Sequence, residues 1–363
     1  MEEGRIGLLR SMFQEKEKTV VSLGGLTAST IRWDTGVYGV RLSGKEGYVS
    51  VLPFMGQQIW DAEMGGRRLT MKSMFDRPKP TDYFLHTYGC FMMHCGALRM
   101  GCPGPEDDHQ LHGELPCAPY QNAEIIFGRD DAGAYIGVTG SYDHDVAFSS
   151  HYTARPEVIL HEDSAILDIN MAIENRASYP MDLMYMCHIN YLPVVGGRIV
   201  QSIPWDREHM VVRSSLPEHT PFTDAFADFL KRIVENPKLT ETIRAEDEYK
   251  PEVAIFIRKP WADEEGWSHF VQVHPDGTGD YVGYKPDELD HSSRWIMRTD
   301  DQQALGIALP ATCDPEGYTA EKKKGALKSI QGKDSVRFHV RTGYLSKPAC
   351  ARMNETIGKM GKR

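Results

Sequence analysis

The chain has 363 residues, of which 25% are charged, and a formal net charge of −10 spread along its length. Basic runs such as residues 359–363 are too short to form a nucleic-acid-binding stripe, so we expect no nucleic-acid partner. No segment reaches the ~18 apolar residues of a membrane span, and residues 1–20 lack the apolar core of a signal peptide. We therefore expect a cytoplasmic protein that binds no membrane.

Seven cysteines make an odd number, and none forms the Cys-x-x-Cys pair that is typical of a zinc site. We interpret them as reduced thiols that mostly pack. Four of them lie between residues 90 and 117, close to His94, His109 and His112. A site for a soft metal therefore stays open as an alternative in this region.

In chain order, a polar arm is expected at residues 1–20, then a long series of strands, and a C-terminal tail at residues 346–363. Residues 165–175 alternate apolar and polar side chains, which is typical of a half-buried strand. Other β-branched or aromatic segments bounded by turn residues are 37–42, 123–127, 134–138, 253–257 and 336–340.

A single helix is well indicated. It begins after Thr223, carries Phe226, Phe229, Leu230 and Ile233 at helical spacing, and stops at Asn236-Pro237. Many strands with one clear helix predict an all-β protein, a large antiparallel β-sandwich that forms one domain over residues 1–363.

Two histidines stand in similar contexts, each beside a strand-like segment: His112 in the run 111–116 and His188 in the run 186–191. A neutral imidazole can hydrogen-bond a hydroxyl or a ring oxygen, and a protonated one can donate to it. Any one of the fourteen histidines is more often at the surface or hydrogen-bonded in the core. The pair together predicts a pocket that holds and protonates a sugar ring.

The runs 111–113 and 188–191, the second following the turn 175–180, resemble the aldose 1-epimerase (galactose mutarotase) superfamily, and more narrowly its DUF4432 branch. Further matching segments are 51–60, 65–69, 94–98, 294–295 and 305–312. The resemblance spans roughly residues 35 to 345. It implies a twisted β-supersandwich with few helices and a sugar-binding groove on one sheet.

In mutarotases of this superfamily one histidine protonates the ring oxygen while a carboxylate removes the proton of the anomeric hydroxyl. The resemblance gives His188 the context of that acid and His112 the context of a second, substrate-orienting histidine. Ring opening needs a proton donor and a proton acceptor at opposite ends of the hemiacetal, and groups with a pKa near neutrality serve best.

The expected carboxylate is missing. In the DUF4432 branch the base is the glutamate of a Gly-Leu-Glu-Pro-Ala-Thr string, but residues 306–312 place Ala308 or Leu309 there, and neither accepts a proton. Glu316 and Glu321 lie downstream and are the nearest replacements, although the turn that holds Glu316 is of a kind usually exposed to solvent.

A second departure favours a metal. His94 stands where the branch commonly has a small hydroxyl residue, and His86 lies eight residues upstream. Three neutral imidazoles, those of His94, His112 and His188, can bind Zn²⁺ or Mn²⁺ and leave positions open for sugar oxygens. The alternative is a polar sugar groove lined by histidines, which needs no metal or other cofactor.

Aromatic side chains supply the other part of sugar recognition, because the C–H face of a pyranose stacks on Trp or Tyr. Trp60, Tyr88, Tyr191 and Trp295 lie near the matching motifs, and Trp295 is the first choice. The residues expected to bind substrate are His94, Glu114, Asn190, Tyr88, Trp60 and Trp295.

Three functions therefore remain, all with a small carbohydrate as the partner and with the oligomeric state open. The first is an isomerase of the aldose 1-epimerase kind acting on a monosaccharide or its derivative. The second is a metal-assisted lyase or isomerase on an oxidised sugar or glycoside. The third is a catalytically silent sugar-binding protein. The resemblance favours the first, and the missing glutamate favours the other two.

Overall fold

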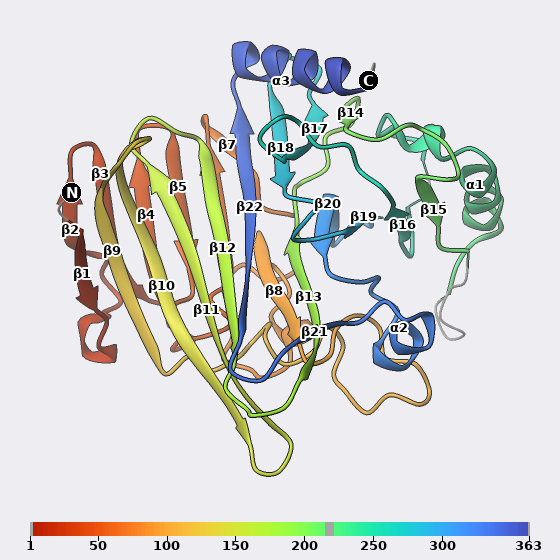
Figure 1. Ribbon diagram of the computed structural model, residues 1–363. Helices are drawn as coiled ribbons and strands as arrows, with labels where there is room; N and C mark the ends of the chain where they lie inside the picture. Colours follow the sequence, from red (N-terminus) through yellow and green to blue (C-terminus); the bar gives the residue numbers. More distant parts are fainter. Residues whose placement is uncertain (1–2, 215–220, 248, 362–363) are drawn as a thin grey trace.

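The computed structural model describes residues 3–214, 221–247 and 249–361, and two large antiparallel β-sheets face each other across a continuous apolar core (Figure 1). The strands of the first sheet, in spatial order, are β1 (Gly4–Gly7), β9 (Asn122–Asp130), β10 (Gly133–Val146), β11 (Ser150–His161), β12 (Ile166–Asn175), β22 (Ser335–Leu345), β18 (Gly279–Tyr284), β17 (Ser268–Val273) and β14 (Arg198–Gln201).

The second sheet carries the cavity described below. Its strands, in spatial order, are β15 (Met210–Val212), β16 (Val253–Ile257), β19 (His291–Arg298), β20 (Gln303–Ala311), β13 (Met181–Ile189), β8 (Met92–Ala97), β6 (Ile59–Met64), β5 (Gly47–Val51), β4 (Tyr38–Gly44), β3 (Leu26–Arg32) and β2 (Lys18–Leu23). Two short strands pair with members of this sheet: β21 (Lys328–Ile330) pairs with β13, and β7 (Arg67–Arg68) pairs with β6.

Helices are few in the described part of the chain. They are α1 (Asp224–Glu235), α2 (Tyr318–Lys324) and α3 (Lys347–Met360), with 3-10 turns η1 (Arg10–Met12), η2 (Phe84–His86) and η3 (Pro237–Thr240). The all-β supersandwich with few helices is thus confirmed. None of these helices is long and apolar enough to cross a membrane.

Strand β12 shows how alternate side chains of a strand form the core between the two sheets. Leu167 and Ile173 are buried in the core, as are Ile169 and Met171, whereas Asp168 is half-buried and pairs with Arg341. The alternation expected from residues 165–175 is confirmed, since successive side chains of a strand point to opposite faces.

The predicted helix is confirmed as α1. The Thr223 side chain accepts a hydrogen bond from the Phe226 backbone N–H at 3.1 Å, which satisfies one of the unpaired donors of the first turn. The four apolar residues of its stripe are buried. The Asn236 side chain then accepts from the Lys238 backbone N–H and begins η3.

The N-terminal segment is not the loose arm that its polarity indicated. Strand β1 pairs with β9, and β2 begins at Lys18. Backbone hydrogen bonds to the edge of a sheet need no apolar side chains, so polarity alone does not mark a segment as unpaired. Residues 1–2 lie outside the described part of the chain.

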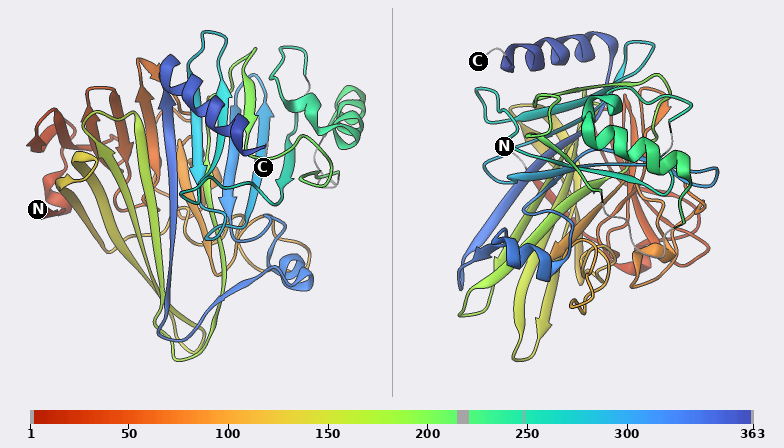
Figure 2. Two further views of the ribbon diagram at one scale, coloured as in Figure 1. Left: turned by 45° about the horizontal axis from the view of Figure 1, so that its top comes forward. Right: turned by 90° about the vertical axis from the view of Figure 1, so that its right-hand side faces the viewer.

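The C-terminal tail is also corrected, because residues 347–360 form α3, with Pro348 in its first turn. Cys350 and Ile357 are buried in a small apolar cluster with Val271 and Tyr281. The helix crosses the end of the first sheet (Figure 2). The two buried residues lie seven positions apart among polar and charged residues. The composition of the segment therefore does not indicate a packed helix. Residues 362–363 lie outside the described part.

One buried titratable group belongs to the core. His94 on β8 is fully buried, its Nδ1 lies 2.8 Å from the Tyr185 hydroxyl, and its Nε2 has no partner. Burial lowers the pKa of His94 from 6.5 to about 3. The unfolded chain therefore binds a proton at pH 5 that the folded chain does not, so stability falls as the pH decreases below about 6.5.

We expect the His94→Gln variant to lose less stability on acidification than the unsubstituted protein. Between pH 7 and pH 5 the difference should be about 2 kcal/mol, because glutamine cannot take up the proton. Urea unfolding at the two pH values measures it. Equal losses in both proteins would contradict the burial of a neutral His94.

Candidate functional site

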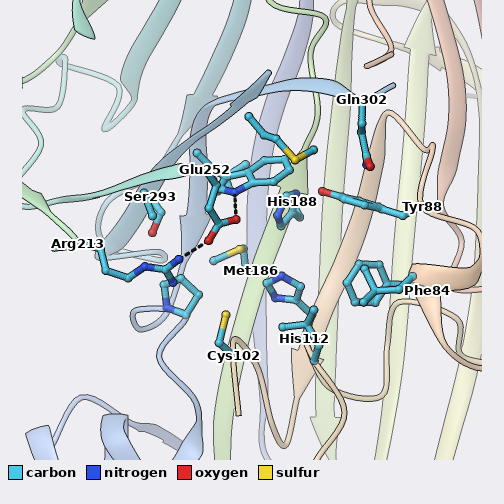
Figure 3. A pocket seen from close by; sticks show the side chains of 17 residues that line it. Phe84, Tyr88, Cys102, His112, Met186, His188, Arg213, Glu252, Ser293 and Gln302 are labelled. Atoms are coloured by element: carbon cyan, nitrogen blue, oxygen red, sulfur yellow. Dashed lines mark hydrogen bonds and ion pairs between the residues drawn. The ribbon is translucent and has the colours of Figure 1, made fainter. Parts of the chain in front are cut away.

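A cavity of about 260 Å³ lies on the face of the second sheet that points away from the core (Figure 3). Its floor is built by strands β13, β19 and β20, and the loops before and after β8 close one side with Phe84 and Leu111. The floor is part of an apolar cluster, separate from the main core, that contains Met93, Met184 and Met186. The cavity brings together side chains from Phe84 to Pro315, which lie more than 200 residues apart in sequence.

Strand β13 is buried on both faces, and its alternation places the His188 side chain on the cavity floor. Met186 and His188 point into the cavity, whereas Tyr185 and Cys187 point into the main core. His188 is 4% exposed, and its Nδ1 has no hydrogen-bond partner. Burial lowers the pKa of His188 from 6.5 to about 4, so the imidazole is neutral at pH 7.

His112 comes from the loop that wraps the end of β8. Its backbone carbonyl accepts from the Gly96 N–H at 3.0 Å, and its own N–H donates to the Gly101 carbonyl at 2.9 Å. The residue has a φ of 62°, a left-handed conformation that is uncommon outside glycine and aims the side chain at the floor. Its ring lies 5.2 Å from that of His188.

The two imidazoles share an electrostatic environment. Burial, and then the neighbouring His188, hold the pKa of His112 well below its usual range. Its Nδ1, like that of His188, is buried without a hydrogen-bond partner. Both imidazoles line the cavity, and each keeps one buried ring nitrogen without a partner, which is costly unless a ligand or water bonds it.

The structure adds a carboxylate that the sequence analysis missed, Glu252, just before β16. One of its oxygens accepts from the Trp295 indole N–H at 2.6 Å, and the other pairs with the Arg213 guanidinium (Figure 3). Glu252 carries no motif. The available signal was its spacing of two from Ala254, which puts both residues on the cavity face of an apolar strand.

The two downstream glutamates considered from the sequence lie elsewhere. Glu321 is fully buried at the start of α2, where it accepts from the Asp314 N–H and pairs with Lys324. Glu316 approaches the cavity only through Arg213, at 3.6 Å, and does not line it. Of Ala308 and Leu309, the two residues considered for the place of the missing glutamate, Leu309 lines the cavity floor.

The three-histidine metal centre that was the alternative from the sequence is not assembled, because His94 lies apart from the His112–His188 pair. His94 pairs in register with Cys187, and His188 with Met93, so His94 faces the main core from the opposite side of the sheet. Met93 and Cys95, the neighbours of His94 in β8, belong instead to the apolar cluster on the cavity side of the sheet. Across the described residues, no group of three or more histidine, cysteine, aspartate or glutamate side chains is arranged to hold a metal ion.

Of the other residues expected to bind substrate, some line the cavity and others are buried outside it. Tyr88 and Trp295 line the cavity with ring centroids 6.2 Å apart. Asn190 is fully buried and accepts from the Tyr88 hydroxyl at 3.1 Å, so it orients Tyr88 instead of lining the cavity. Trp60 is buried in the apolar cluster beneath, and the Tyr191 hydroxyl bonds the Tyr281 carbonyl of the facing sheet.

Glu114 does not line the cavity either. One of its oxygens accepts from the Ala97 N–H and the Leu98 N–H, each at 2.9 Å, and from the Tyr152 hydroxyl at 2.7 Å. Tyr152 belongs to β11 of the facing sheet. Glu114 therefore anchors the loop that carries His112.

Comparison with known structures identifies the fold class as that of the galactose mutarotase-like proteins. A candidate aldose 1-epimerase from Klebsiella pneumoniae is 17% identical, with a TM-score of 0.79 over 99% of this chain and 96% of that one. A galactose mutarotase-like protein from Clostridium acetobutylicum is 13% identical, with a TM-score of 0.59 over 89% of this chain and 99% of that one. At these identities the likeness establishes the fold alone.

The chain belongs to the family described as Domain of unknown function (DUF4432), whose model matches residues 36–343. This confirms the resemblance that the histidine motifs indicated. The Slr1438 protein from Synechocystis is a further structural relative, 15% identical with a TM-score of 0.54 over 82% of this chain and 91% of that one. A search of curated proteins returned no match.

We expect Glu114→Ala to destabilise the protein by about 2 kcal/mol or more, because three buried donors lose their acceptor. Glu114→Gln keeps the acceptor oxygen and should cost clearly less. Denaturant unfolding compares the two variants. If they are equally stable, the three hydrogen bonds do not hold the loop.

Proposed function

We propose that the protein is a carbohydrate-active enzyme of the aldose 1-epimerase type, which interconverts the anomers of a monosaccharide bound in the His112–His188 cavity. The observation that carries the proposal is the meeting of Glu252 with the imidazoles of His112 and His188 in one cavity of monosaccharide size. The fold shared with galactose mutarotase-like proteins supports the same reading at the level of architecture.

Anomer interconversion needs two proton transfers at one hemiacetal. In the proposed mechanism Glu252 accepts the proton of the anomeric hydroxyl while protonated His188 donates to the ring oxygen, and the ring opens to the aldehyde. After rotation about the bond to the carbonyl carbon the transfers reverse and the other anomer closes. No electrons are exchanged, so the reaction needs no redox cofactor.

The surroundings of Glu252 suit a base. The Trp295 N–H and the Arg213 guanidinium fix the two oxygens, which holds the carboxylate in one orientation. The Trp295 ring also lies 5.6 Å from the His188 ring, edge to face. The same residue thus positions the base and contacts the acid.

His112 is proposed to orient the sugar by a hydrogen bond from or to a hydroxyl, since its Nδ1 has no partner within the protein. The Tyr88 and Trp295 rings offer flat apolar faces on which the C–H groups of a pyranose can stack. Both roles are those of substrate binding.

We expect Glu252→Gln to reduce the catalysed rate at least 100-fold, because an amide cannot accept the anomeric proton. Exchange spectroscopy by NMR, or polarimetry on freshly dissolved anomers, measures that rate. Glu355→Gln, at an exposed position on α3 where the glutamate pairs with Lys359, is the matched control and should keep full activity. A fully active Glu252→Gln variant would remove Glu252 from the mechanism.

A protein that binds sugar but accelerates nothing would be the silent binder of the same fold. Titration of the unsubstituted protein with monosaccharides, alongside the rate measurement, separates these two functions. Binding without acceleration in the unsubstituted protein would overturn the epimerase proposal.

The pH dependence gives an independent test. The donor form of His188 is lost above its pKa, which burial lowers to about 4. We therefore expect kcat/KM, which reports on the free enzyme, to decrease from pH 5 to pH 8, by up to tenfold per pH unit. A profile that is flat over this range after subtraction of the uncatalysed rate would show that imidazolium is not the donor.

A further inference from the structure

The centre of the cavity floor is apolar. Ser293 on β19 pairs in register with Leu309 on β20, and Met186 on β13 pairs with Ala311. Leu309 lies two residues before Ala311 and His188 two residues after Met186, so the antiparallel pairing brings Leu309 near His188, and both line the cavity. Leu309 therefore separates the polar Ser293 from the proposed acid.

This apolar floor is closely packed. Met186 is fully buried, Leu309 is 2% exposed, and both belong to the apolar cluster beneath the cavity. Leu111 and Met297 extend the apolar surface along the walls. A sugar hydroxyl pressed against Leu309 or Met186 would lose its hydrogen bonds to water and gain none from these side chains.

The charged side chains at the polar end of the cavity already pair with one another. The Arg213 side chain is 10% exposed and is held between Glu252 and, at 3.6 Å, Glu316. Two carboxylates thus face one guanidinium. A further carboxylate on the substrate would meet a locally negative group, which disfavours an oxidised, acidic sugar.

Building on the proposed function, we propose that the substrate is an uncharged deoxysugar, which turns a carbon without a hydroxyl toward Leu309 and Met186. In this arrangement His188 donates a proton to the ring oxygen, and Glu252 accepts the proton of the anomeric hydroxyl. His112 forms a hydrogen bond with one of the remaining hydroxyls. The apolar floor provides the specificity, and the reacting groups provide the chemistry.

The size of the preference follows from the nature of the floor. An apolar pocket rejects a ligand that adds one hydroxyl only moderately, by about 10-fold to 100-fold. We expect the ratio of kcat/KM for a deoxysugar to that for its parent sugar to fall in this range. The acidic parent should be rejected more strongly than the neutral one.

The experiment measures catalysed anomer exchange by NMR with the unsubstituted protein on matched pairs: glucose and 2-deoxyglucose, galactose and 6-deoxygalactose, and glucuronate as the acidic sugar. Each rate is divided by its own uncatalysed rate. At least one deoxysugar should exceed its parent by about tenfold or more. Parents that react as well as both deoxysugars, or glucuronate as the best substrate, would overturn the inference.

Two variants at the floor sharpen the result. Leu309→Met keeps an apolar side chain and should keep the preference, whereas Leu309→Asn offers a hydrogen-bonding partner and should reduce the deoxysugar-to-parent ratio. Because the ratio is taken on one protein sample, a loss of folded protein cancels. An unchanged ratio in a folded Leu309→Asn variant would show that Leu309 does not select the substrate.

Failure of the proposed function looks different. In that case no sugar of the panel is accelerated, and dissociation constants from titration replace rates for the same matched pairs. Tighter binding of a deoxysugar would keep the inference about the floor while removing the epimerase. Equal binding of all neutral sugars would overturn the inference itself.

Discussion

The site depends on one constraint: from Leu183 to Ile189, β13 is buried on both faces, and its alternate side chains face the main core and the cavity side of the sheet. Met186 and His188 face the cavity because Tyr185 and Cys187 face the core. A slip of one residue in the pairing with β8 would exchange the two sets and place His188 in the core. The packing of the sandwich therefore fixes which residues can react.

Around this floor, polar groups are held in place by hydrogen bonds and ion pairs with neighbouring side chains. Asn190 orients Tyr88, and Arg213 orients Glu252. The low pKa of His188 has the same origin, since the burial that fixes the ring also disfavours its charged form. Burial of His188 thus has two results: it fixes the orientation of the ring, and it lowers the pKa of the imidazole.

The sequence predicted the all-β fold, the helix α1 and the convergence of His112 and His188, because each leaves a local pattern: alternation, helical spacing or a short motif. It did not predict Glu252, whose role depends on strands β16 and β19 lying side by side. It also placed His94 in the site, because motif proximity does not say which face of a strand a residue occupies. Both errors concern pairing between distant segments, which no single segment encodes.

The hydrogen bond from Tyr152 to Glu114 joins the two sheets at the point where the His112 loop is attached. The position of His112 over the cavity floor is therefore tied to the spacing between the sheets, although the cavity lies outside the sandwich. Any substitution that thickens the core near β11 acts on the distance between the two imidazoles. Core volume is in this way a geometric parameter of the site, and repacking far from the ligand can retune it.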